Sequence, residues 1–170
     1  MEPSLVSREQ HEDIMLSRRS KRNWAKTFIL IGDGFDELEV VYFLHKFREA
    51  GLPIKTVSLF DRLVTSRQGV GLKADYALAD MPFDPELDCL IVLPAGGHNG
   101  EILRHDARVK SLLRSLNRAG QGRIAVTRGN SRLWEEIGEV VTERPRYRPE
   151  QDEDLPAFVE SLRDRVVYAV

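Results

Sequence analysis

From residue 27 onward, short apolar runs alternate with stretches in which apolar residues recur every three or four positions. The apolar runs at residues 28–31, 54–59 and 89–93 are typical of strands that a parallel sheet buries on both faces. A shorter strand is predicted over residues 123–127. Because strand and helix patterns alternate, the sequence predicts right-handed βαβ units and therefore an α/β domain, in which helices cover both faces of a mainly parallel sheet.

The stretches between these runs predict four helices. The first ends before Gly51, and the second runs from Asp106, a residue type that caps helices, to Gly120. The third covers residues 131–137, and the fourth lies near the C-terminus. In the first and last helices the apolar positions share one helical face. They are Val40, Phe43, Leu44 and Phe47 in the first, and Leu155, Phe158, Val159, Leu162 and Val166 in the last.

Two further segments lack both patterns. Residues 63–78 contain Gly69 and Gly71 and are predicted to be extended or to form a hairpin. Residues 144–149 are predicted to be a loop, because prolines interrupt them, and an acidic stretch follows as far as residue 154.

Residues 1–26 differ in composition from the rest and are predicted to be a polar extension in front of one domain, residues 27–170. The extension is acidic first and then basic. One interpretation is a solvated tail. The other is a docking arm, because four apolar residues of the extension have no evident place in the core: Ile14, Met15, Leu16 and Trp24.

Length and composition narrow the function classes. The chain has 170 residues, of which 42% are hydrophobic and 31% charged, as is typical of one globular domain. A net charge of −2 predicts no general affinity for nucleic acid. No apolar run reaches the roughly 20 residues of a membrane span, and the N-terminus lacks the apolar core of a secretory signal. A single cysteine excludes an internal disulfide, so a cytoplasmic location is expected.

Four segments, in this order and spacing, resemble motifs of the ThiJ/PfpI family. They are residues 31–39, 64–75, 88–96 and 122–129, and the resemblance covers roughly residues 27–138. It implies a flavodoxin-like three-layer α/β/α sandwich of the class I glutamine-amidotransferase-like superfamily, usually homodimeric. The family has two further strands before its last helix, whereas only residues 139–154 fill that space here. The chain is therefore identified as a divergent, shortened member.

The resemblance also implies where the family's chemistry would lie. The family places a thiolate on a strand-to-helix turn, beside an acid from the first helix and backbone N–H groups of a glycine turn. On this sequence the acid is Glu39, and the glycine turn contains Gly96 and Gly97. The nucleophile position falls on Thr127 or, by a strict count from the strand start, on Arg128. Neither is cysteine, so the catalytic cysteine is missing.

The remaining candidate residues each have a structural alternative. Cys89 begins a different strand and is predicted to lie in the core. Glu39 has the spacing of a capping box with Asp36 as N-cap, which competes with a role in the pocket. His98 follows the glycine turn and is either a proton-exchanging group at the pocket or merely solvated. The four histidines show no metal-ligand spacing, so no metal and no cofactor is expected.

Three functions fit these observations. The first is a catalytically degenerate, pseudoenzyme-like domain that serves as an assembly or regulatory subunit, with a protein partner or a second copy of itself. The second is a glyoxalase- or amidase-like hydrolase or lyase that uses Thr127, Glu39 and His98. The third is a sensor that binds an anion or metabolite without turnover, through Glu39, Thr127, Arg128 and the glycine turn.

Overall fold

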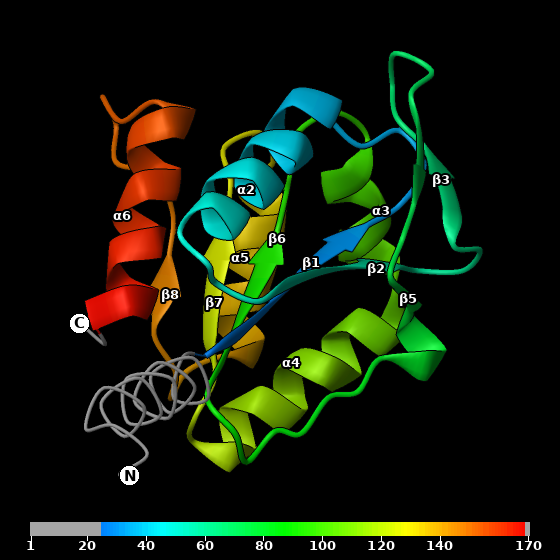
Figure 1. Cartoon of the computed structure of the whole chain (residues 1–170). Coiled ribbons are helices and arrows are strands. Elements are labelled where there is room, and N and C mark those ends of the chain that lie inside the picture. The colour runs from blue at the N-terminus through cyan, green and yellow to red at the C-terminus, as the bar shows by residue number, and fades with distance from the viewer. Residues whose placement is uncertain (1–24, 169–170) are drawn as a thin grey trace, which may run out of the picture.

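The structure, a computed structural model, describes residues 25–168 and consists of one sheet with helices on both faces (Figure 1). The six strands of the sheet run in the order β5-β2-β1-β6-β7-β8, and every neighbouring pair is parallel. They are β1 (Lys26–Ile31), β2 (Ile54–Ser58), β5 (Tyr76–Ala77), β6 (Cys89–Leu93), β7 (Arg123–Val126) and β8 (Arg146–Tyr147). The prediction of a mainly parallel sheet is confirmed.

The helices divide between the two faces of the sheet. Along β1, Ile29 and Ile31 pack with one group of helices, whereas Phe28 and Leu30 pack with the other, because successive side chains of a strand point to opposite faces. The first face is covered by α2 (Glu37–Glu49) and α6 (Leu155–Tyr168). The second is covered by α3 (Asn99–His105), α4 (Ala107–Ala119) and α5 (Ser131–Val140). This is the expected three-layer α/β/α sandwich.

Local signals placed most element ends correctly. The side chain of Asp106 accepts hydrogen bonds from the backbone of the first turn of α4, and Gly120 ends that helix with φ +80°. Asn130 caps α5 through the N–H of Leu133. The segment predicted as extended or hairpin contains an antiparallel hairpin of β3 (Leu63–Thr65) and β4 (Gly71–Lys73), and then β5.

Two elements were missed. The seven residues of α3 carry few apolar positions, so they show no helical stripe and could not be distinguished from the preceding turn. The segment predicted as a loop contains β8, which pairs with β7 between Pro145 and Pro149. A two-residue edge strand can accept flanking prolines, because few of its N–H groups are needed for pairing.

The predicted extension of residues 1–26 lies outside the described residues except for Ala25 and Lys26. Within residues 25–168, no helix combines the length and the apolar character needed to cross a bilayer.

Candidate functional site

The candidate site lies where β1, β6 and β7 end next to one another. β2 pairs with one edge of β1, and β6, which comes later in the chain, pairs with the other edge. The connections after β1 and β6 therefore run in opposite directions along the sheet, and they diverge at the carboxyl ends of these two strands. Ligand sites of open parallel sheets lie at such points, outside the carboxyl ends of the strands. Here the loops after these strands bring together Glu39, the glycine turn and Thr127.

Glu39 and Thr127 form a closed, buried pair. The Thr127 hydroxyl donates to Glu39 Oε1 at 2.8 Å, and its oxygen accepts the backbone N–H of Ala95 at 2.7 Å. Both residues are buried, with exposed fractions of 7% for Glu39 and 4% for Thr127. The sequence motifs left Thr127 and Arg128 as alternatives for the nucleophile position, and it is Thr127 that meets the acid of the first helix.

The glycine turn contributes two backbone donors, and the pair uses both. Ala95 N–H points at Thr127, and Gly96 N–H donates to Glu39 Oε1 at 3.3 Å. The approach is close enough that a Cβ on Gly96 would lie 3.0 Å from Glu39 Oε2. Gly97 adopts φ +63°, a conformation that other residues rarely take. The turn is therefore fitted tightly around the carboxyl group.

Burial raises the pKa of Glu39 to about 7, because the charged form has lost its water. The hydrogen bonds from Thr127 and Gly96 act in the opposite direction, since they stabilise the carboxylate. Both donors point at Oε1, so Oε2 is the oxygen available to carry a proton. A carboxyl group near neutrality can exchange a proton at physiological pH.

The sequence motif at residues 36–39 predicted a capping box, and the structure shows its N-cap but not the second contact. Asp36 is the N-cap of α2, and its side chain accepts from the backbone N–H groups of Leu38 and Glu39. The Glu39 side chain does not fold back to complete a capping box. It turns instead towards the sheet, where Thr127 and Gly96 bind it.

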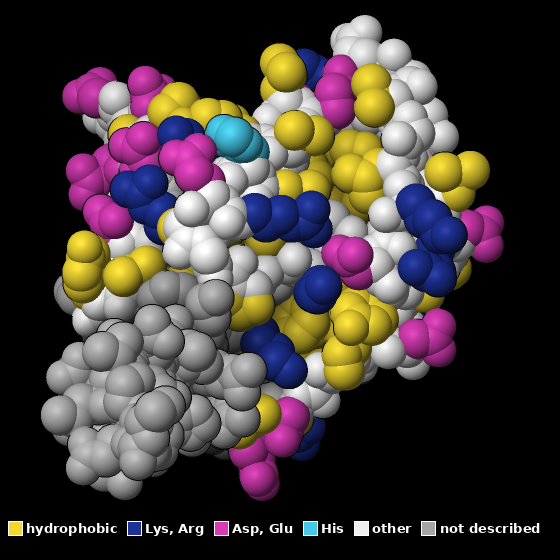
Figure 2. Space-filling view, viewed as in Figure 1, with side chains coloured by type: hydrophobic (Ala, Val, Ile, Leu, Met, Phe, Trp, Pro, Cys, Tyr) yellow, Lys and Arg dark blue, Asp and Glu magenta, His cyan; other side chains and the backbone are white. Residues whose placement is uncertain are grey.

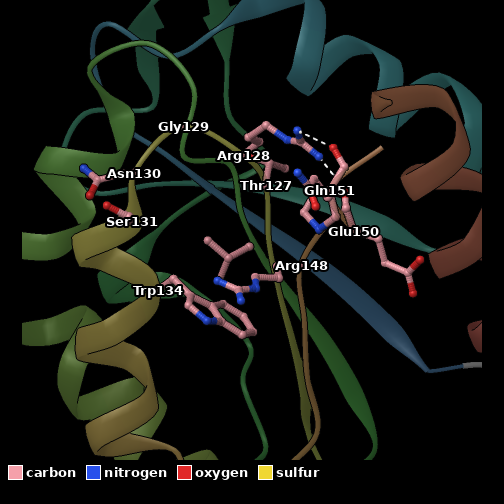
Figure 3. A pocket seen from close by; sticks show the side chains of 11 residues that line it. Thr127, Arg128, Gly129, Asn130, Ser131, Trp134, Arg148, Glu150 and Gln151 are labelled. Atoms are coloured by element: carbon pink, nitrogen blue, oxygen red, sulfur yellow. Dashed lines mark hydrogen bonds between the residues drawn. The ribbon is translucent and has the colours of Figure 1, made fainter. Parts of the chain in front are cut away.

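Arg128 follows Thr127 but faces another partner. Its guanidinium donates to the backbone carbonyls of Glu150, Gln151 and Glu153, the segment that leads into α6 (Figure 3). Arg128 therefore fastens this segment over the end of β7. Binding of a ligand by Arg128 stays a prediction.

The other two candidates lie apart from the pair. His98 is exposed, and its ring hydrogen-bonds to no side chain in the described part of the chain, so a role in proton exchange stays a prediction. Cys89 is buried in the core at the start of β6, as predicted, and burial raises the pKa of its thiol to about 12. Such a thiol is neutral at physiological pH and is therefore not an activated nucleophile. Among residues 25–168, no three histidine, cysteine or acidic side chains gather closely enough to hold a metal ion.

The residue that sequence reasoning missed at this corner is Asn99, which is fully buried. Its Oδ1 accepts the N–H of Gly32 at 2.7 Å, and its Nδ2 donates to the carbonyls of Leu30 and Pro94 at 3.2 and 2.6 Å. One amide thus joins the ends of β1 and β6. An asparagine two positions after Gly97 was the available signal, because asparagine side chains often bond to nearby backbone.

Two hollows open beside the pair. One, of about 300 Å³, is lined by Glu39, Thr127 and the start of α6. The other, of about 820 Å³, lies on the other side of Arg128, between the start of α5 and residues 148–151. Trp134 and Arg148 in its wall were not singled out from the sequence.

Comparison with known proteins finds a matching family model, a similar curated protein and solved structures with a similar fold. The model of the DJ-1/PfpI family matches residues 25–159. A curated deglycase of Thermococcus kodakarensis is 29% identical over 104 residues, which are 61% of this chain and 61% of that protein. The chain thus aligns with less than two thirds of the length of this relative.

Solved structures agree on the fold. A DJ-1 superfamily protein of Salmonella typhimurium, solved as a mutant, superposes with a TM-score of 0.66 at 18% identity, covering 85% of this chain and 91% of that one. The DJ-1beta protein of Drosophila melanogaster gives a TM-score of 0.66 at 17% identity and the same coverage. A two-domain protein of Anabaena variabilis, which combines a DJ-1/ThiJ/PfpI-like with a ferritin-like domain, gives 0.60 at 14% identity, covering 82% of this chain and 49% of that one.

Proposed function

This chain belongs to the DJ-1/PfpI family, and we propose that it is a catalytically degenerate member, which works as an assembly or regulatory subunit. The observation that carries the proposal is the closed state of the Thr127 hydroxyl. The hydroxyl donates a hydrogen bond to Glu39, its oxygen accepts one from the N–H of Ala95, and 4% of the residue is exposed. A hydroxyl held in this way has a structural role, because it joins Glu39 to the glycine turn.

Nucleophilic catalysis needs more than a hydroxyl with a base. It needs backbone donors aimed at the oxygen on which negative charge develops. The N–H groups of Ala95 and Gly96 are the donors of the glycine turn that reach the site, and both are occupied by Thr127 and Glu39 themselves. A substrate carbonyl would have to displace these bonds, and the buried partners would then be left unsatisfied at a cost of about 1–3 kcal/mol each.

A deglycase- or amidase-like hydrolase is the second candidate, and one contact favours it. Glu39 Oε1 lies 2.8 Å from Thr127 Oγ1, within reach of a general base, and its pKa of about 7 suits proton transfer. The curated relative from Thermococcus kodakarensis is named a deglycase. These features support an enzyme, whereas the burial and the occupied donors oppose it.

The assembly role has a surface that fits a second copy of the chain. Leu38 and Val41 are 76% and 51% exposed on α2, and Val70 is 47% exposed in the turn of the β3–β4 hairpin. Arg67 ties this turn to the start of α2, through its N–H to the Phe35 carbonyl at 3.0 Å. Figure 2 shows hydrophobic side chains at the surface between the two elements. DJ-1/PfpI proteins are often oligomeric, so we assign this surface to self-association.

The charges on the face in Figure 2 support a protein partner over nucleic acid. Figure 2 shows acidic side chains gathered on one part of this face, and the Lys and Arg side chains near its centre have an acidic side chain among them and form no continuous stripe that could follow a phosphate backbone.

Activity assays separate the two candidates. The full chain is tested on glyoxal, amide and glycated amino-acid substrates beside Thr127→Val, with the Thermococcus kodakarensis deglycase as positive control. We expect the same background rate for the chain and the variant. Turnover that disappears in Thr127→Val would overturn the degenerate assignment and establish the hydrolase.

Self-association is measured separately, by analytical ultracentrifugation of the full chain. We expect an oligomer that dissociates in Leu38→Glu. Leu87→Glu is the matched control, because Leu87 is 58% exposed but lies in the loop before β6. A monomeric chain, or equal loss in both variants, would show that α2 and the hairpin are not the interface.

A further inference from the structure

The cavity of about 820 Å³ has the properties of a ligand site, and Thr127 lines it whereas Glu39 does not. One wall is the first turn of α5 with Ser131 and Trp134, and the opposite wall is the segment 148–151 (Figure 3). Its volume lies within the range of about 300–1,000 Å³ that is typical of small-molecule sites. The short connection between β8 and α6 forms its outer wall, so the site is a product of the shortened edge of this chain.

The charged groups around the cavity favour an anion. Arg128 and Arg148 both line it, and neither forms an ion pair with a carboxylate among residues 25–168. The hydrogen bonds of Arg128 go to carbonyl groups, which leave its charge in place. Glu150 is the acidic residue of the lining, and in Figure 3 its carboxylate points away from Trp134.

The polar end of the cavity adds donors without adding negative charge. Asn130 caps α5 by accepting from Leu133 N–H, so the N–H of Ser131 has no partner within the helix. The carboxylate of Glu101 lies behind Asn130, at 3.0 Å from its amide nitrogen. The guanidinium of Arg104 lies 3.2 Å from that carboxylate and compensates its charge.

The other end of the cavity is built around the indole ring of Trp134, against which two guanidinium groups lie. Trp134 forms this wall, and Val126 and Pro149 contribute to the lining. The Arg148 guanidinium lies 4.9 Å from the centre of the indole ring, which holds its charge at this end of the cavity. Arg146 lies at 4.5 Å from the same ring but does not line the cavity.

We propose that this cavity binds a small organic anion, a carboxylate or a phosphate ester with a flat apolar body. The anionic group is held by Arg148 and the start of α5, and the body lies along Trp134. Charge-assisted bonds to a guanidinium supply the affinity, and the indole wall selects for shape. This site gives a degenerate family member a means of responding to a metabolite, because the segment 148–151 would be fixed by the bound ligand.

The test follows the indole N–H signal of Trp134 by NMR in the full chain, assigned with Trp134→Phe. The probes are benzoate and phenyl phosphate, which separate the two anion classes, inorganic phosphate, which lacks the flat body, and benzamide, which has the shape of benzoate but no charge. We expect saturable shifts with benzoate or phenyl phosphate, and binding at least about tenfold weaker for benzamide and inorganic phosphate, a difference of about 1.4 kcal/mol.

Two variants complete the experiment. Arg148→Gln should weaken binding of the better probe by about tenfold or more, whereas Arg132→Gln should change it less than about twofold. Arg132 is exposed in the same turn of α5 and does not line the cavity, so it controls for the general effect of one lost charge. The proposal is overturned if neither aromatic anion gives a saturable shift, if benzamide binds equally well, or if both variants weaken binding alike.

Discussion

Replacing Glu39 by glutamine should remove most of the pH dependence of stability at the candidate site. Burial raises the pKa of Glu39 from 4.5 to about 7, so the folded chain holds the proton more tightly than the unfolded chain does. The resulting stabilisation is fully present below the unfolded pKa, and it is lost as the pH rises through the folded one. Glutamine keeps an acceptor for Thr127 and Gly96 but cannot ionise.

The magnitude follows from the size of the shift. A difference of about 2.5 pKa units, at 1.36 kcal/mol for each, corresponds to about 3 kcal/mol of unfolding free energy between about pH 4 and about pH 8. Urea unfolding at a series of pH values measures it. Glu39→Gln should give a curve that is flatter than that of the unmodified chain by about this amount.

Glu135→Gln is the matched control, since this carboxylate is exposed on α5 and hydrogen-bonds to no group among residues 25–168. It should retain the slope of the unmodified chain. If the unfolding free energies of Glu39→Gln and of the unmodified chain fall in parallel as the pH rises, then burial does not hold the Glu39 carboxyl group in its neutral form. That result would refute the description of Glu39 and Thr127 as a closed, buried pair.

Three other substitutions test the frame of the site. Thr127→Val leaves the buried N–H of Ala95 without an acceptor and should lower the unfolding free energy by about 2–4 kcal/mol, whereas Thr65→Val, on the exposed hairpin, should change it by less than about 0.5 kcal/mol in the same urea titration. Asn99→Ala removes three hydrogen bonds between strand ends and should cost about 3 kcal/mol or more, and a midpoint equal to that of the unmodified chain would contradict the bridging role. Arg128→Gln should release residues 150–153, seen as faster amide hydrogen exchange there with little change in β7, and unchanged exchange would show that the guanidinium does not hold this segment.

The strands and long helices could be predicted because their buried positions are apolar and recur with the period of the strand or helix. A strand covered on both faces, such as β6, must be apolar throughout, and all five of its residues are buried. The elements that were missed, α3 and β8, have seven and two residues, too few for a period to show. Their formation depends on tertiary contacts, such as the pairing of β8 with β7.

The site could be predicted in part for a related reason. The motif placed Glu39 on the first turn of α2, but its spacing fits both a cap and a pocket residue, and the choice depends on Thr127, which is 88 positions away. Counting along β7 likewise left Thr127 and Arg128 open. Only the direction of each side chain separates them, and Thr127 faces the buried acid whereas Arg128 faces the loop.

The contacts of Arg128 and the shortened edge of the sheet account for each other. With only residues 141–154 between α5 and α6, the chain after β8 passes directly over the end of β7. Carbonyl groups of this segment then face the strand-to-helix turn, and Arg128 supplies the donors that they need. Thr127 lines both hollows beside this segment, so the segment that Arg128 holds shapes the space around position 127. The Arg128 contacts and the short connection between β8 and α6 therefore belong together, and they separate the smaller hollow at Glu39 from the larger cavity beside Trp134.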